Sequence, residues 1–360
     1  MRFLCVHYAT MKNVLRALGF ILGLGVFASP LLAQVGGSST YAYLELSPSA
    51  RITALGGYLL ATEDDDLTLG YQNPALYNPE MGGRMAFAHA FGPGGIQYGY
   101  AAYAGNLKRK EMTVGGGLLY RNYGRFEGRD AAGNWQPGFS ASEYALQAGT
   151  AYRGEKLRYG ANLKLLYSQL ESYTSVGVAV DLGVAFVDTG SLFSAALVMR
   201  NIGTQFAAYT PGDREALPFQ VNLGISQRLR YLPLRLSLTL HDLQKADIRY
   251  DDPNAAQQNT LLFGQDQPEE PRYTADKIFR HVAVGAEFNF GQNVRARFGY
   301  DHQTRGELAT DGKPGLTGFS TGFGIRVKQF RFDYAHAITH ISGRNNHLTL
   351  NVDMAAFGGR

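Results

Sequence analysis

Residues 217–229, LPFQVNLGISQRL, alternate between apolar and polar side chains. Apolar residues occupy every second position from Leu217 to Ile225, and the positions between them include Gln220, Asn222 and Ser226. A period of two places successive side chains on opposite faces of an extended chain. This stretch therefore predicts a β-strand with one apolar face and one polar face.

The same pattern recurs along most of the chain. Several such segments reach about 10–15 residues, whereas the strands of soluble proteins usually have about 5–6. A tilted strand needs about 9–11 residues to cross a bilayer. The sequence therefore predicts an all-β fold, a transmembrane antiparallel β-barrel of about 14 strands, rather than a soluble sandwich. The predicted strands lie near 85–91, 96–104, 111–123, 140–153, 156–170, 173–187, 191–201, 217–229, 233–248, 278–290, 293–303, 316–327, 329–338 and 345–354.

The connections between the predicted strands alternate in length. Every second connection is short, such as GE at 154–155 and DTG at 188–190, whereas 124–139, 202–216 and 249–277 are long. Short turns on one side and long loops on the other are typical of barrels in the outer membrane of Gram-negative bacteria. An even strand number then places both chain ends on the periplasmic side and the long loops outside the cell.

The first 33 residues have the layout of a secretory signal peptide. Lys12 and Arg16 precede an apolar stretch that ends with a small residue at Ala33, and Met11 is an alternative start. Without this leader the chain has nearly balanced charge and no run rich in Lys and Arg, so we expect no nucleic-acid partner. The only cysteine, Cys5, also lies in the leader, which leaves none for a disulfide.

The stretch EDDDLTLGYQNPALYNPE, residues 63–80, interrupts the regular pattern before the first predicted strand. Its two Asn-Pro pairs disfavour both helix and central strand, because proline lacks an amide donor and restricts the residue before it. Irregular backbone is tolerated at membrane depth only inside protein or a water-filled lumen. We therefore expect residues 34–84 to form an N-terminal plug inside a barrel of residues 85–357. The alternative is a disordered periplasmic tail, against which the leucines between Leu55 and Leu76 argue.

No segment has the pattern of a catalytic or metal site. GFSTG at 318–322 matches the nucleophile-elbow pattern, but that chemistry needs a strand–turn–helix corner and Ser320 falls inside a predicted strand. His336 and His340 have no partners at metal-ligand spacing, so we expect no metal, no cofactor and no enzymatic activity. Polar side chains on the inward face are expected to pair with each other or with the plug, or else to line a solute path: Arg295, Arg297, Asp301, Arg331, Asp333 and Asp353.

Residues 47–81 and the strands after them resemble the hatch and barrel of the FadL-like outer-membrane proteins. An Asn-Pro-Ala motif ends the hatch in that family, and Asn73, Pro74 and Ala75 match it. Longer segments are similar to the PorQ family of the Bacteroidetes type IX secretion system, which belongs to the PorV-related barrels. These segments are spread along the chain and include NYGRFEGRDAAGN (122–134), LSLTLHDLQKADIRYDDPN (236–254) and RFGYDHQTRGEL (297–308).

The resemblance implies a protein without catalysis that resides among outer-membrane lipids. Proteins of this family are expected to hold a PorZ-like surface protein in an attachment complex with a sortase and a shuttle barrel, which links secreted cargo to lipopolysaccharide. The longest loop, 249–277, is the predicted partner-binding segment, because exposed aromatic residues are favoured interface anchors. Its candidate residues are Tyr250, Asp251, Asp252, Phe263 and Tyr273. The alternative is a FadL-like transporter for a hydrophobic small molecule, which needs a lumen pocket and an exit.

Overall fold

Strands make up most of the part of the chain that the structure describes. The computed structural model describes residues 39–107, 112–130, 132–248, 274–308, 315–340 and 343–357, so the predicted signal peptide lies outside it. The strands are β1 (Arg84–Phe91), β2 (Gln97–Leu107), β3 (Met112–Arg129), β4 (Trp135–Arg153), β5 (Leu157–Leu170), β6 (Tyr173–Asp188), β7 (Phe193–Ala207), β8 (Gln220–Arg228), β9 (Leu234–Leu240), β10 (Val282–Phe290), β11 (Val294–Asp301), β12 (Phe319–Val327), β13 (Phe330–His340) and β14 (Gly343–Asp353).

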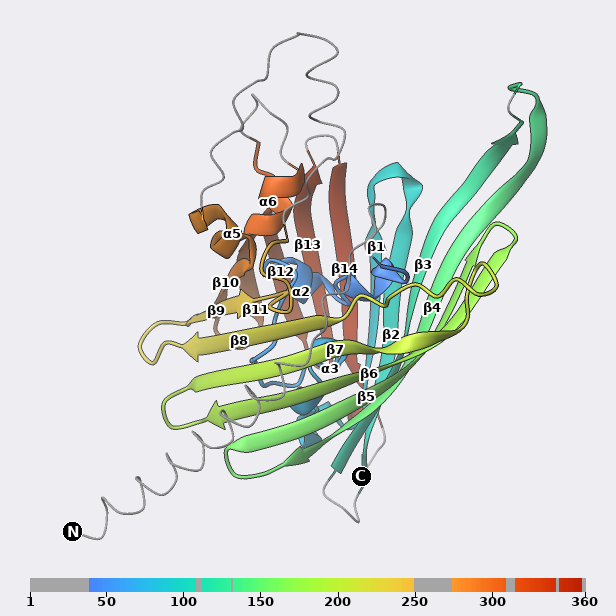
Figure 1. The fold of residues 1–360 in the computed structure, drawn as a ribbon. Helices are drawn as coiled ribbons and strands as arrows, with labels where there is room; N and C mark the ends of the chain where they lie inside the picture. Colours follow the sequence, from blue (N-terminus) through green and yellow to red (C-terminus); the bar gives the residue numbers. More distant parts are fainter. Residues whose placement is uncertain are drawn as a thin grey trace. The chain divides into compact units, whose positions relative to one another are not determined.

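These fourteen strands close into one antiparallel barrel in which neighbours in sequence are neighbours in space (Figure 1). The closure is made by β1 and β14, which pair from Arg84↔Asp353 to Phe91↔Asn346. The prediction of a closed 14-strand antiparallel barrel is therefore confirmed. Closure also satisfies the backbone hydrogen bonds of the wall, which an open sheet would leave unpaired at its edges. No helix among the described residues is long and apolar enough to cross a membrane.

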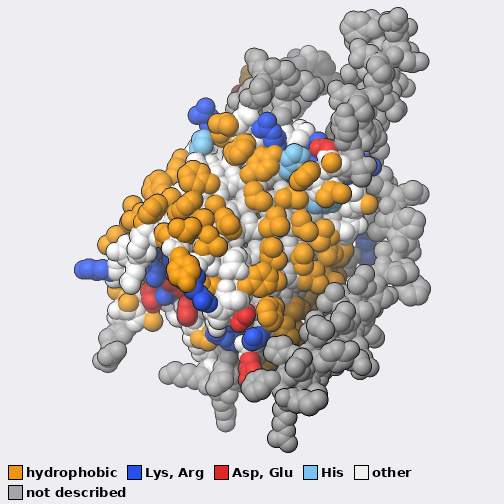
Figure 2. Space-filling model, turned by 90° about the vertical axis from the view of Figure 1, so that its left-hand side faces the viewer, with side chains coloured by type: hydrophobic (Ala, Val, Ile, Leu, Met, Phe, Trp, Pro, Cys, Tyr) orange, Lys and Arg blue, Asp and Glu red, His pale blue; other side chains and the backbone are white. Residues whose placement is uncertain are grey.

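Side chains of the wall alternate between its two faces. In β4, Ala145 and Gln147 are buried toward the inside, whereas Tyr144 and Leu146 are exposed on the outside. On the side of the wall that contains β8 to β11, the outward apolar side chains form a broad band (Figure 2). The inward positions hold many charged and amide groups, and these are buried by the N-terminal segment.

Residues 39–83 fill the inside of the barrel with short helical turns. These are η2 (Ala42–Glu45), α2 (Ala50–Thr53), α3 (Leu69–Gln72), η3 (Pro74–Leu76) and η4 (Pro79–Met81). Their apolar side chains are fully buried and pack against small inward residues of the wall, such as Ala145 and Ala185. The hydrophobic core therefore lies between this plug, residues 39–83, and the inner face of the barrel.

Each Asn-Pro pair starts one of the 3-10 turns. Asn73 Oδ1 accepts a hydrogen bond from the Ala75 amide at 2.9 Å, and Asn78 Oδ1 accepts one from the Glu80 amide at 2.9 Å. In both turns the asparagine caps the start and proline occupies the first helical position, where its missing amide donor costs nothing. The irregular stretch thus contains two capped turns: η3 is buried inside the barrel, whereas Pro79 and Glu80 of η4 are exposed.

The largest departure from the predicted strands concerns residues 124–139. They were expected to form a loop, yet they extend β3 and β4 into one long hairpin. Phe126 pairs directly with Phe139 across this hairpin, and their rings stack at 5.1 Å. Such cross-strand aromatic pairs stabilise a hairpin, and they explain why the strands continue.

Three further predicted strands are too long. β9 ends at Leu240 rather than near residue 248, because Asp242 adopts a left-handed conformation with φ of 55° and turns the chain. The short helices α5 (Thr274–Arg280) and α6 (His302–Leu308) occupy the ends of the segments predicted as strands near 278–290 and 293–303.

Candidate functional site

The Asn-Pro-Ala motif is fully buried against the wall. Asn73 Nδ2 donates to the Leu60 carbonyl oxygen at 2.7 Å, while its Oδ1 holds the Ala75 amide. One amide side chain therefore ties two segments of the plug together and caps η3. Pro74 and Ala75 lie in that turn, so all three predicted motif residues act together in the structure.

Glycines of β5 and β6 let this turn touch the wall backbone. A methyl group added at Gly160 would clash with the carbonyl group of Pro74, and one at Gly183 would clash with Asn73 Oδ1. Any side chain at either position would force the plug away, so the contact requires glycine. This side of the plug is held by close packing.

Polar groups of β5 and β6 add support next to the motif. Asn162 Nδ2 donates to the Gly70 carbonyl oxygen at 2.9 Å. Lys164 Nζ lies 2.8 Å from Asp181 and 4.7 Å from the centre of the Tyr71 ring. The plug side chain Tyr71 thus covers a buried ion pair of the wall and makes a cation–π contact with it.

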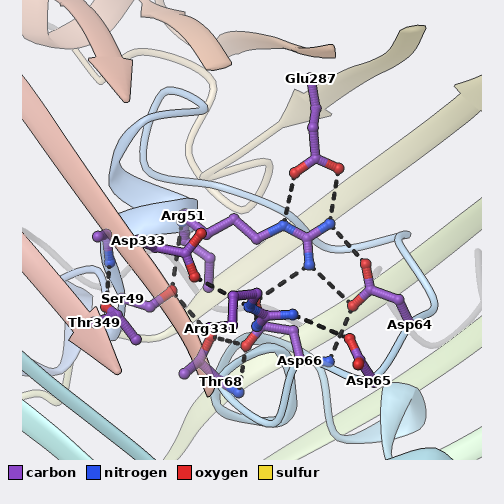
Figure 3. Close-up of polar contacts among 12 residues, drawn as sticks. Ser49, Arg51, Asp64, Asp65, Asp66, Thr68, Glu287, Arg331, Asp333 and Thr349 are labelled. Atoms are coloured by element: carbon purple, nitrogen blue, oxygen red, sulfur yellow. Dashed lines mark hydrogen bonds and ion pairs between the residues drawn. The ribbon is translucent and has the colours of Figure 1, made fainter. Parts of the chain in front are cut away.

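Arg51 of α2 lies at the centre of a buried ion network (Figure 3). Its Nε is 2.9 Å from Glu287 of β10, its Nη2 is 2.7 Å from Asp64, and its Nη1 is 3.2 Å from Asp66. Glu287 belongs to the wall and the two aspartates belong to the plug. One guanidinium, only 1% exposed, therefore joins the plug to the barrel.

The acidic run of the plug also contacts arginines of other wall strands. Arg331 of β13 lies 2.8 Å from Asp66 and 3.0 Å from Asp65. Asp65 also pairs with Arg326 and with Arg84, the latter at 3.1 Å. Asp64, Asp65 and Asp66 are therefore the plug's half of this ion network, whereas Glu63 pairs with Arg158 of β5 and, at 3.4 Å, with Arg153 of β4.

Within the wall, Arg297 of β11 bridges the carboxylates. It lies 2.8 Å from Glu287 and 2.7 Å from Asp333 of β13. The predicted pairing of inward charges with each other and with the plug is thus observed for Arg297, Arg331 and Asp333. Removing one member of such a buried network leaves an uncompensated charge, which costs about 3–5 kcal/mol.

Asp64 and Asp65 of the plug remain ionised in this environment. Burial alone would raise the pKa of Asp64, but the adjacent Arg51 guanidinium holds it well below its ordinary value. Burial would also raise the pKa of Asp65, but the Arg331 guanidinium is the main cause that lowers this pKa below its ordinary value. Both contributions are complete above the ordinary pKa of 3.8 and are lost only as the pH falls through lower values.

A second polar cluster lies where β9 and β11 end. The Tyr58 ring of the plug stacks on His241 at 4.6 Å, and His241 lies 3.0 Å from Asp242 and 3.2 Å from Asp301. Burial would lower the pKa of His241, but hydrogen bonds with the two aspartates outweigh it and raise the pKa to about 9. Burial raises the pKa of nearby Glu45 to about 7, with the Asp242 charge adding to it.

A cavity of about 290 Å³ lies between the plug and these strand ends. Its polar and aromatic lining includes residues of η2, the segment after α2 and five strands. They include Glu45, Tyr58, Tyr98, Asp301, Phe319 and Asn345. Among the described residues no group of three or more His, Cys, Asp or Glu side chains is placed to hold a metal ion.

The other predicted candidates divide into two groups. The predicted partner-binding residues, Tyr250, Asp251, Asp252, Phe263 and Tyr273, lie outside the described residues. Ser320 of the GFSTG stretch accepts a hydrogen bond from the Gly56 amide at 3.2 Å, within a strand and against the plug. His336 lies 2.9 Å from Asn346 Oδ1.

Arg51, Glu287 and His241 were not singled out by the sequence. Arg51 stands 236 positions before its partner Glu287, so no local pattern links them. The available hints were an arginine among the small residues SARITALGG and a glutamate on the polar face of a predicted strand. Neither hint identifies a partner without the closed barrel.

Comparisons with known proteins return only solved structures. No protein-family model and no curated protein matches the chain. One similar structure is a Pseudomonas aeruginosa FadL homologue, with 10% identity, a TM-score of 0.48, and coverage of 85% of this chain and 98% of that one. Another is a deletion mutant of the TodX monoaromatic hydrocarbon channel, with 13% identity, a TM-score of 0.45, and coverage of 84% and 96%. The KdgM porin is similar at 5% identity and a TM-score of 0.32, with coverage of 75% and 98%.

Proposed function

We propose that this chain is a closed barrel of the outer membrane that holds a surface protein without catalysing a reaction. The observation that carries the proposal is the filled lumen, in which Arg51 of the plug is fixed between Glu287 of the wall and two carboxylates of its own segment. The sequence resemblance described above gives the setting, an attachment complex of the type IX secretion system. The partner is then a PorZ-like surface protein.

Residence in the membrane is supported by the outer face of the wall. In water, a band of exposed leucine, phenylalanine and tyrosine side chains would be unfavourable for a closed barrel. Leu146, Leu163 and Leu165 are each about half exposed on neighbouring strands β4 and β5. In lipid the same side chains meet acyl chains, and the inward polar groups meet the plug.

A holding role fits the filled lumen better than a pore does. An open channel needs a continuous wet path, and here residues 39–83 occupy the inside with a hydrophobic core and a buried ion network. Moving the plug would separate Arg51 from Glu287 of the wall and would separate Arg331 of the wall from Asp65 and Asp66, and each loss costs about 3–5 kcal/mol. The barrel is therefore a stable body that presents its ends to partners.

The second candidate is transport of an apolar molecule, and one feature favours it. An apolar hollow of about 610 Å³ lies on the outside of the wall and is lined by Phe193, Ile225, Leu236, Leu238, Val284 and Phe298, among others. Its floor includes Gly285, whose inner face lies against Leu55 of the plug. A transporter would need a shift of the plug to connect this hollow with the lumen.

The experiment is purification of the tagged full-length protein from outer membranes of cells that contain its partners. A holder should bring down a surface-exposed protein in near-equal amount, and deletion of the barrel gene should release that protein into the medium. The purified barrel should give no stable ion conductance in a planar bilayer, because the plug fills it.

The same cells separate the two candidates. If the surface protein stays attached without the barrel, while uptake of a long-chain apolar solute falls, the holding role is wrong and transport is favoured. Arg51→Met in the same uptake assay serves as a comparison, because a transporter with a loosened plug should take up solute faster.

A further inference from the structure

The β3–β4 hairpin projects beyond the wall strands on both of its sides (Figure 1). β2 pairs with β3 only as far as Asn122, and β5 pairs with β4 only from Ala141, with one more hydrogen bond from Glu171 to the Ser140 carbonyl oxygen. Past these points β3 and β4 pair only with each other. The projecting part therefore has two strand edges whose backbone groups face no neighbouring strand of the wall.

The tip of this hairpin is closed by a well-bonded turn. Asp130 accepts hydrogen bonds from the Ala132 and Asn134 amides at 2.9 and 2.8 Å, and from Asn134 Nδ2 at 2.9 Å. The Asn134 side chain and backbone lower the pKa of Asp130, so this carboxylate stays charged. The turn fixes the position of Trp135, the next residue and the only tryptophan of the chain.

Both faces of the projecting hairpin carry aromatic side chains. Phe126 and Phe139 stack across the strands and continue the inward-facing series of β4. The register shift between Phe126 and Gly128 places the Arg129–Trp135 pair on the other face, where the guanidinium lies 3.9 Å from the centre of the Trp135 ring. All three rings are open, since Phe126, Phe139 and Trp135 are 41%, 38% and 65% exposed.

The two edges of the hairpin differ in their capacity to accept another strand. The β4 edge carries Pro137, which lacks an amide donor and blunts that edge. Past its last pair with β2, the β3 edge carries no proline and two arginines, Arg125 and Arg129, against one acid, Glu127. An extended segment with acidic side chains would satisfy both the free backbone groups and the positive charge of β3.

We propose that this hairpin is the docking arm for the surface protein, which places an acidic extended segment along the β3 edge and apolar contacts on Phe126 and Phe139 of one face and on Trp135 of the other. The inference rests on the holding role proposed above and names where that role is performed. Trp, Tyr and Arg are the residues that most often dominate the free energy of binding at protein interfaces. A rigid hairpin also loses little conformational entropy when a partner binds.

A polysaccharide is the competing occupant, since aromatic rings and arginines also bind anionic sugars. The free backbone edge favours a protein as the occupant, because a strand edge offers alternating donors and acceptors that match an extended peptide. Binding to purified lipopolysaccharide micelles is therefore the control in every arm of the test.

The test uses the full-length barrel and the double variant Phe126→Ala with Trp135→Ala. The matched control is Tyr231→Ala, which truncates a 93% exposed aromatic side chain in the turn between β8 and β9. We expect the double variant to bind the co-purified surface protein at least about thirtyfold more weakly, and the control to bind as wild type does. Heat-dependent migration on gels should show that all three barrels are folded.

A second measurement addresses the strand edge. Hydrogen exchange of the amides of residues 125–129 should slow at least about tenfold in the complex, with a smaller change at 136–139. Charge reversal by Arg125→Glu with Arg129→Glu should weaken binding and reduce its dependence on salt.

The outcomes separate this inference from the holding role. If wild type brings down no surface protein, the proposed function itself fails. If the double variant keeps the partner, or if exchange at 125–129 does not change, the docking arm is wrong although the barrel remains a holder. If the double variant no longer binds lipopolysaccharide micelles but still binds the surface protein, the aromatic residues of the hairpin form a saccharide site and the inference is overturned.

Discussion

The plug meets the two halves of the barrel wall by different physical means. Against β5 and β6, the Asn73–Ala75 turn lies on Gly160 and Gly183 with no charge involved. Against β10 to β13, Arg51 and the acidic run meet Glu287, Arg297 and Arg331 in a buried ion network. The first half relies mainly on close packing, although Glu63 of the plug also pairs with Arg158 of β5, and the second half relies on charge.

The difference shows how one short segment can be fixed inside a barrel. Close packing on glycine tolerates no added atom, yet it is indifferent to pH and salt. The ion network tolerates small movements, because charge attraction falls slowly with distance, but it requires every member to be present. Together the two halves define both the position and the orientation of the plug.

The largest effect is expected at the packed half. Gly160→Val places atoms where the Pro74 backbone lies, so the plug cannot seat and the loss of stability should exceed about 5 kcal/mol. Limited proteolysis within residues 39–83 would report the released plug. Gly105→Val is the control, because a Cβ at that position has one neighbour at 3.9 Å. If residues 39–83 are equally resistant to the protease in the two variants, close packing on Gly160 does not hold the plug.

The next effect is expected at the charged half. Arg51→Met removes the guanidinium from Glu287, Asp64 and Asp66 and should lower the free energy of unfolding by about 3–5 kcal/mol. The control is Lys156→Met, which breaks an exposed pair with Asp188 and should cost at most about 1 kcal/mol. Urea unfolding in detergent measures both, and similar small losses would mean that the network does not hold the plug.

A third prediction concerns the outside of the wall, which both halves share. Leu238 lines the apolar outer hollow, so Leu238→Arg should cost about 2–4 kcal/mol for a barrel in lipid. Tyr231→Arg, at a 93% exposed turn position, should change stability by less than about 0.5 kcal/mol. Folding measured in lipid vesicles tests this pair. A small loss at Leu238 would place this side of the wall outside the bilayer.

The smallest effect is expected from pH, at the cluster around His241. The pKa of His241 is raised to about 9 from an ordinary value of 6.5, so its contribution is complete below pH 6.5 and is lost as the pH rises through about 9. The loss should be on the order of 3 kcal/mol. Unfolding measured from pH 6 to pH 10 should show this slope in wild type. His241→Gln should remove the part above about pH 8, where Glu45, with a pKa of about 7, is already ionised. A slope that persists there in the variant would assign the effect to another group.

Much of the fold could be predicted because the wall has a simple local pattern. Alternation of side chains in stretches such as 217–229 fixed the strands and their faces, since lipid outside and a polar interior select opposite residue types. The missed boundaries lie at strand ends, where cross-strand contacts extend β3 and β4 and where a left-handed residue ends β9. Those contacts join residues that are not adjacent in sequence.

The sequence by itself determined the number of strands, which side chains face outward, and the presence of an irregular stretch with two Asn-Pro pairs before the first strand. Tertiary structure alone decided which partners the acidic run meets, because Arg331 stands more than 260 positions after Asp65. It also decided that Gly160 and Gly183 are contact points, since a glycine in a strand looks the same in the sequence whether or not another segment lies against it. The reason is physical: alternation is a property of each strand in its surroundings, whereas pairing of charges and close contact of backbones exist only once the barrel has closed around the plug.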